Sequence, residues 1–135
     1  MTTVAYPITK AAILGADVDL LADTIKAVLV DADYVYSAAH DFLADVVAGA
    51  RIGSAVTLTG KAVALGVFTA ADPTFTAVAA GDTVTGIIVY QHTGVEATSR
   101  LIAYSNRKAD TTAISVATTN GNITLTWPSG RVLKI

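Results

Sequence analysis

The stretch Gly86-Ile87-Ile88-Val89-Tyr90 decides the fold, because its apolar side chains follow one another without a polar interruption. Successive side chains of a strand point to opposite faces of the sheet, so a strand of this composition must be covered on both sides. The similar stretch Leu101-Ile102-Ala103-Tyr104 is predicted to be its antiparallel neighbour. We expect one core to contain Ile87, Val89, Leu101, Ala103 and Trp127, with Ile88 and Tyr90 covered from the opposite side.

From residue 50 onward, short runs of Val, Ile, Thr and Tyr alternate with Gly, Asp, Pro and Asn, which is typical of strands joined by turns. Asn120-Gly121 is a hairpin signal that places Ile123, Leu125 and Trp127 on one face. Since no helix of crossover length lies between the runs, we predict a mainly β, antiparallel sandwich or barrel-like domain. The predicted strands lie near Arg51–Leu58, Lys61–Phe68, Phe75–Val78, Thr83–His92, Arg100–Ser105, Thr112–Ala117, Ile123–Trp127 and Val132–Ile135.

The first part of the chain carries the only candidate helices. Residues 8–16 form a helical turn or an arm that ends near Gly15, and residues 38–47 have apolar side chains at helical spacing. Between them, Thr24–Val30 is β-branched and predicts a strand with Ile25, Ala27 and Leu29 on one face. We therefore expect one or two short helices near the N-terminus, an arm or helix over 1–16, and one β-rich domain over 17–135.

Charge is scarce in this sequence. Its 135 residues are 53% hydrophobic and only 15% charged, with a net charge of −2, whereas an average soluble domain is roughly 25% charged. Such a surface is either covered in part by neighbouring subunits or simply rich in Thr and Ser. Arg107-Lys108 is the longest basic run, which disfavours nucleic-acid binding. No apolar stretch reaches the length of a membrane span, and the N-terminus has no secretory pattern, so we expect a cytoplasmic product.

The residues suited to catalysis are few. The chain has no Cys, and its two His residues, His40 and His92, are far apart in sequence. Ser37, His40 and Asp41 lie close together, but a catalytic triad is defined by geometry rather than by sequence spacing. A solvated or capping His40 is the simpler interpretation.

Metal and phosphate motifs are incomplete. Asp17/Asp19 and Asp31/Asp33 resemble fragments of a calcium loop, but the Gly and Glu that complete such a loop do not follow, which favours turn or capping roles. Thr59-Gly60-Lys61 lacks the earlier Gly of a phosphate-binding loop. We predict no catalytic, cofactor-binding or metal-binding residue, and therefore no enzyme.

Aromatic residues are the remaining candidates for function. Tyr90, Tyr104 and Trp127 lie in predicted strands and are assigned to the core. Two segments, 1–16 and the 31–37 loop, contain five candidates for contact with another chain: Val4, Tyr6, Ile8, Tyr34 and Tyr36. Packing within the same domain is the alternative.

Six stretches in order along the chain carry a resemblance: Asp23–Val30, Leu58–Val63, Gly66–Asp72, Ile88–Gly94, Thr98–Tyr104 and Ile123–Trp127. Together they resemble a family of small virion proteins found among the structural genes of tailed bacteriophages. The resemblance covers nearly the whole chain, and it brings no catalytic residue with it.

That resemblance implies a capsid cement (decoration) protein on the virion surface, made in the host cytoplasm, with the major capsid protein as its partner. By analogy with cement proteins on three-fold axes, it implies a homo-oligomer, favouring a trimer. A tail or baseplate component is one alternative. A small-molecule or carbohydrate-binding β-domain is another, because β-domains present aromatic side chains to sugars.

Overall fold

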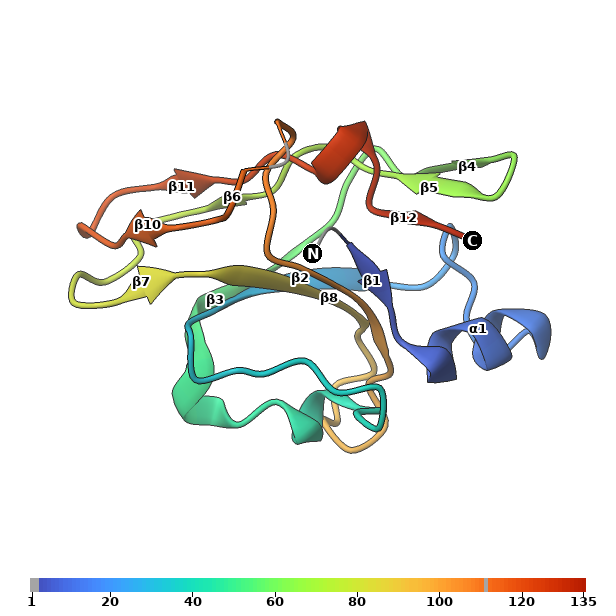
Figure 1. Ribbon diagram of the computed structural model, residues 1–135. Coiled ribbons are helices and arrows are strands. Elements are labelled where there is room, and N and C mark those ends of the chain that lie inside the picture. The colour runs from blue at the N-terminus through green and yellow to red at the C-terminus, as the bar shows by residue number, and fades with distance from the viewer. Residues whose placement is uncertain (1–2, 111) are drawn as a thin grey trace.

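The computed structural model describes residues 3–110 and 112–135, and its centre is an antiparallel sheet of five strands (Figure 1). The strand order is β1-β9-β8-β2-β3. All six residues of β8 are buried, which confirms the central strand predicted from Gly86–Tyr90. The bounds are β1 Val4–Ala5, β2 Ile25–Val30, β3 Arg51–Thr57, β8 Gly86–Gln91 and β9 Leu101–Ser105.

Three small antiparallel sheets form a second layer, which lies above the central sheet in Figure 1. The sheets do not close into a barrel, and the arrangement fits a sandwich, so the predicted mainly β class is confirmed. Between the layers lies the first core, with Ile25, Ala27, Leu29, Phe68, Phe75, Ile87, Val89 and Trp127 among its members. The strands are β4 Ala62–Ala64, β5 Val67–Thr69 and β12 Leu133–Lys134, then β6 Thr74–Phe75 with β11 Ile123–Thr124, and β7 Thr83–Val84 with β10 Val116–Ala117.

The other face of the central sheet is covered by the loops of residues 31–50 and by the N-terminal segment. A second core fills this side, made of Tyr6, Val28, Val30, Tyr34, Leu43, Val46, Ala50, Ile88, Tyr90, Leu101 and Tyr104. One α-helix, α1 (Pro7–Leu14), begins with a proline at its first position, where the missing N–H costs nothing. Three short 3₁₀ turns complete the described chain: η1 Leu43–Asp45, η2 Ala48–Ala50 and η3 Pro128–Gly130.

Leu101 lies on the opposite face from the one predicted. The register pairs Val89 with Ala103 but Tyr90 with Leu101, so β9 carries one extra residue, Ile102, at this point. Such a bulge breaks the two-residue alternation. Ile102 and Ala103 both join the first core, and Leu101 joins the second. Ile87, Val89 and Trp127 face the first core, and Ile88 and Tyr90 face the second, as predicted.

The turn at Asn120-Gly121 forms, but its flanking strands do not pair with each other. Asn120 has a φ of 67°, the left-handed conformation expected of a tight turn. β10 pairs instead with β7, and β11 pairs with β6. The turn packs against residues 77–82, because the Asn120 and Asn122 side-chain oxygens accept hydrogen bonds from the Ala80 and Ala77 N–H groups. The predicted hairpin is therefore wrong, although Ile123, Leu125 and Trp127 do share the first core.

The predicted helix over residues 38–47 is also wrong, because only the 3₁₀ turn η1 forms there. The Asp45 carboxylate accepts hydrogen bonds from the N–H groups of Asp41 and Phe42 at the start of this turn, and the turn ends at Val46, whose backbone is extended. Val47, predicted to share the apolar face, is 62% exposed.

The predicted strand over residues 61–68 is a hairpin. β4 and β5 pair through the register Ala64 opposite Val67, which leaves Leu65 and Gly66 as a two-residue turn. The sequence gives no polar turn residue before Gly66, so the run reads as one strand.

Candidate functional site

The five interface candidates gather on β9 and the second core. Val4 pairs directly with Tyr104 in the sheet. Tyr6 is fully buried, and its N–H donates to the Ile102 carbonyl at 3.1 Å. Ile8 and Tyr36 are half-buried against the same core. Sequence reasoning therefore singled out residues that lie close together within one chain.

Four tyrosines form the centre of this cluster. The ring of Tyr36 lies 5.2 Å from that of Tyr6 and is stacked 6.0 Å from that of Tyr104. The rings of Tyr34 and Tyr104 meet edge to face at 5.3 Å. A chain of hydroxyl contacts runs outward, with the Tyr6 and Tyr34 oxygens 2.5 Å apart and the Tyr34 oxygen 3.1 Å from His40 Nδ1.

Burial raises the pKa of Tyr6 far above its ordinary value, and the hydrogen bond from Tyr34 acts in the same direction. Burial likewise raises the pKa of Tyr34 and of Tyr104. These phenols stay protonated near neutral pH, so none of them supplies a phenolate base or nucleophile. The cluster holds the N-terminal segment on the sheet.

This arrangement corrects two of the interface predictions. Tyr6 and Tyr34 are 0% and 6% exposed inside a single chain, so their side chains cannot reach another one. The physical reason is that the second face of the central sheet needs apolar cover, and these large rings supply it. Val4, Ile8 and Tyr36 keep part of their surface exposed, and their contact with another chain stays a prediction.

Ser37 and His40 each have hydrogen-bond partners different from those that a catalytic triad would require. The Ser37 hydroxyl accepts a hydrogen bond from the Ala39 N–H, and the His40 ring pairs with Tyr34. The paired carboxylates act in turns: Asp19 accepts from the N–H groups of Leu21 and Ala22, and Asp31 accepts from that of Asp33. These are the turn and capping roles that the sequence favoured.

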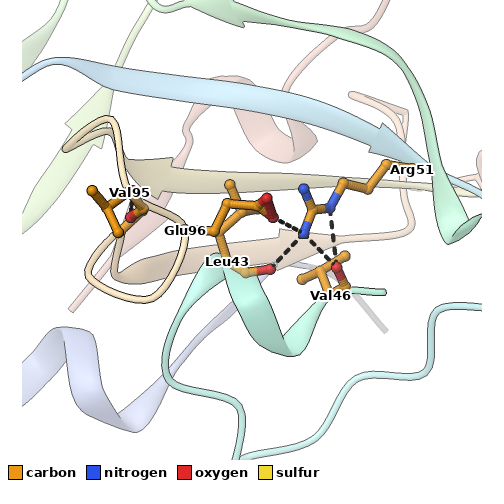
Figure 2. A network of polar contacts seen from close by, with 6 residues as sticks. Leu43, Val46, Arg51, Val95 and Glu96 are labelled. Atoms are coloured by element: carbon orange, nitrogen blue, oxygen red, sulfur yellow. Dashed lines mark hydrogen bonds and ion pairs between the residues drawn. The ribbon is translucent and has the colours of Figure 1, made fainter. Parts of the chain in front are cut away.

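A network of polar contacts centres on Arg51 (Figure 2). Its guanidinium donates to the carbonyl oxygens of Leu43 at 2.9 Å and Val46 at 2.6 Å, and pairs with the Glu96 carboxylate at 2.5 Å. The hydrogen bond and charge of Arg51 lower the pKa of Glu96. Arg51 thereby ties the 43–46 turn and the 92–99 loop to β3, a structural role.

Sequence reasoning missed an apolar recess between α1, the following loop and the β4–β5 hairpin. It comprises two adjoining hollows of about 360 and 220 Å³ that share Ile13, Leu20 and Val63. Around it, Leu14, Leu21, Leu65 and Ile135 are 89%, 52%, 101% and 61% exposed. The recess is assembled from segments far apart in sequence, so the only local signal is Leu65 in a turn position. Exposed apolar groups in one place are typical of contact surfaces.

Within residues 3–110 and 112–135, no three His, Cys, Asp or Glu side chains come together in a group that could hold a metal ion. No helix in this part of the chain is both long and apolar enough to cross a membrane. Comparison of the sequence with protein-family models and with curated proteins gave no match.

Proposed function

We propose that this chain is a non-enzymatic structural subunit of a tailed-phage virion, a cement protein that stabilises the capsid shell by protein–protein contacts. The observation that carries the proposal is the order and spacing of the six stretches that resemble small phage virion proteins. One of these stretches contains β2, and two others include most of β8 and of β9, and these three strands lie side by side in the central sheet. The resemblance therefore includes the scaffold of the fold.

Two properties of the structure support a contact role. Eight large apolar side chains are exposed on the described surface: Leu14, Leu21, Val35, Val47, Val63, Leu65, Val95 and Ile135. His40 pairs with Tyr34, and the buried Tyr6 stays protonated near neutral pH. A subunit of this kind gains affinity from many weak, symmetric contacts.

The proposed partners are the major capsid protein and further copies of this chain, at the outer surface of the virion. A carbohydrate-binding role receives less support, because Trp127 is only 3% exposed and its indole N–H is bonded to the Ala71 carbonyl. The ring is therefore not free to stack on a sugar.

The test is to locate the chain in particles of the phage that encodes it. Antibody raised against the purified protein should label the heads in electron micrographs. Heads reconstituted with the protein should also withstand higher temperatures than heads without it. Labelling confined to the tail would replace the cement role with that of a tail or baseplate component, and unlabelled particles would overturn both.

A further inference from the structure

Leu65 occupies a position that leucine does not favour. Leu65 and Gly66 form a two-residue hairpin turn in which both have positive φ, 50° and 78°. Turns of this geometry prefer Asn, Asp or Gly at the first position, because a Cβ is crowded there. The Leu65 side chain is also 101% exposed, so packing within the chain gives nothing in return. Neither local conformation nor the core accounts for a leucine here.

The hairpin tip is held firmly on the body of the molecule. The Ile135 N–H donates to the Gly66 carbonyl at 2.9 Å, and the Val132 N–H donates to the Phe68 carbonyl at the same distance. Phe68 itself is 2% exposed in the first core. Leu65 is thus an apolar knob on a fixed backbone, and a segment that is already ordered loses little backbone entropy on binding.

The apolar recess described above begins at the same hairpin. Val63 and Gly66 line it on one side, and Ile13 and Leu20 line it on the other. The nearby charges are engaged with backbone: Lys61 donates to the Asp23 carbonyl at 2.6 Å, and the Asp19 carboxylate accepts from two N–H groups. Asp19 lines the larger hollow, whereas the smaller hollow is lined by apolar residues alone.

We propose that this recess receives Leu65 of a second copy of the chain. The knob and the recess are both apolar, and they adjoin on one hairpin. A two-fold pair can therefore insert each Leu65 into the partner's recess, as an isologous interface requires. A leucine that enters the smaller hollow meets only apolar residues there, because no charged residue lines it. The inference rests on the proposed function, because a subunit that acts by contact can use copies of itself as partners.

Leu65→Asn is the decisive variant, because Asn suits the turn while removing the apolar knob. Sedimentation of the full chain over a range of concentrations should show self-association, which Leu65→Asn weakens at least about 10-fold. The melting temperature should be unchanged or higher. Val35→Asn is the matched control, since Val35 is 74% exposed but does not line the recess. It should associate like the parent.

A second variant tests the recess independently of the turn. Val63→Thr keeps a β-branched side chain in β4 and makes the recess wall polar, so it should also weaken association. The proposal is overturned if the parent chain stays monomeric, or if neither Leu65→Asn nor Val63→Thr changes its association. It is also overturned if Val35→Asn weakens association as much as they do. Because purified protein suffices, failure here is distinct from failure of the labelling experiment on particles.

Discussion

At the scale of single residues, Tyr6 is the side chain on which the second core depends. It is fully buried, its ring packs against Tyr36, and its hydroxyl lies 2.5 Å from that of Tyr34. Removing such a phenol from water favours its neutral form, and the unfolded chain lacks this preference. The cluster therefore links folding stability to alkaline pH.

We predict that stability falls as the pH rises above about 10, the ordinary pKa of tyrosine. The folded-state pKa of Tyr6 is raised, so above this pH the unfolded chain releases a proton that the folded chain retains. The stabilisation is complete below pH 10 and declines above it, by about 1.4 kcal/mol per pH unit for a tyrosine that stays protonated. Urea unfolding at a series of alkaline pH values measures the decline.

Tyr6→Phe is the control for this dependence, because it removes one titrating group and keeps the ring. The free energy of unfolding should then fall less steeply above pH 10, because the unfolded variant releases about one proton fewer. A parent and variant with the same slope would mean that Tyr6 ionises freely in the folded state.

Arg51 and Glu96 form one ion pair but should differ in their effect on stability. The Arg51 side chain is 18% exposed and serves two carbonyl oxygens, whereas that of Glu96 is 54% exposed. Exposed ion pairs contribute little, while carbonyl groups that lose a charged donor are costly. We predict that Arg51→Met lowers the free energy of unfolding by about 2 kcal/mol. Glu96→Gln should have a much smaller effect, and both are measured by chemical denaturation.

At the scale of elements, the sequence predicts those strands whose positions are set by side-chain alternation and composition. β2, β8 and β9 were found because uninterrupted apolar or β-branched runs specify buried strands. The bulge at Ile102 and the partners of β10 and β11 could not be found, because both depend on segments distant in the chain. The three-residue turn η1 forms in place of a predicted helix because the distant Arg51 bonds to the carbonyl oxygens of Leu43 and Val46, which a longer helix would bond internally.

The candidate site shows the same division. Its tyrosines could be singled out from their type and positions, but whether a neighbouring chain or the same chain covers them is a property of the tertiary fold. The recess required α1, the β4–β5 hairpin and the C-terminal strand to meet, which no local pattern indicates.

The β4–β5 turn is the element whose geometry is most restrictive. Gly66 has a φ of 78°, and a Cβ added there would lie 3.0 Å from the Ile135 carbonyl oxygen. Gly66→Ala should therefore lower the free energy of unfolding by about 1–2 kcal/mol. Gly49→Ala is the matched control, since an added Cβ there meets no atom within 4 Å. Thermal melts should leave the control near the parent, and equal melting of both variants would contradict the turn assignment.

At the scale of the whole molecule, the single chain exposes about as much surface as an ordinary folded monomer. Its accessible surface is 6437 Å², close to the roughly 6,600 Å² that size scaling gives for a folded chain of 13.8 kDa. The N-terminal segment helps to bury the central sheet, because β1 pairs with β9 and the Thr9 hydroxyl donates to the Leu101 carbonyl. It folds onto its own chain, as the alternative interpretation of residues 1–16 required.

Deleting residues 1–7 should therefore unfold the domain rather than merely weaken assembly. The deletion removes β1 and Tyr6, which leaves one edge of the central sheet and the second core uncovered. Loss of a buried aromatic side chain alone costs about 3–5 kcal/mol, against a total stability of about 5–15 kcal/mol for a small domain. Circular dichroism should show a much lower melting temperature or no folded state.

Two substitutions separate the contribution of the Tyr6 ring from that of the deleted strand. Tyr6→Ala should lose most of the unfolding free energy that the deletion loses, because it empties the same part of the second core. In this variant β1 keeps its pairing with Tyr104 and Ala103. Tyr6→Phe should cost only about 1 kcal/mol, the usual value of one hydrogen bond, since the ring still fills the space. A truncated protein that melted like the parent but no longer self-associated would mean that the segment acts between chains, with Tyr6 dispensable for the fold.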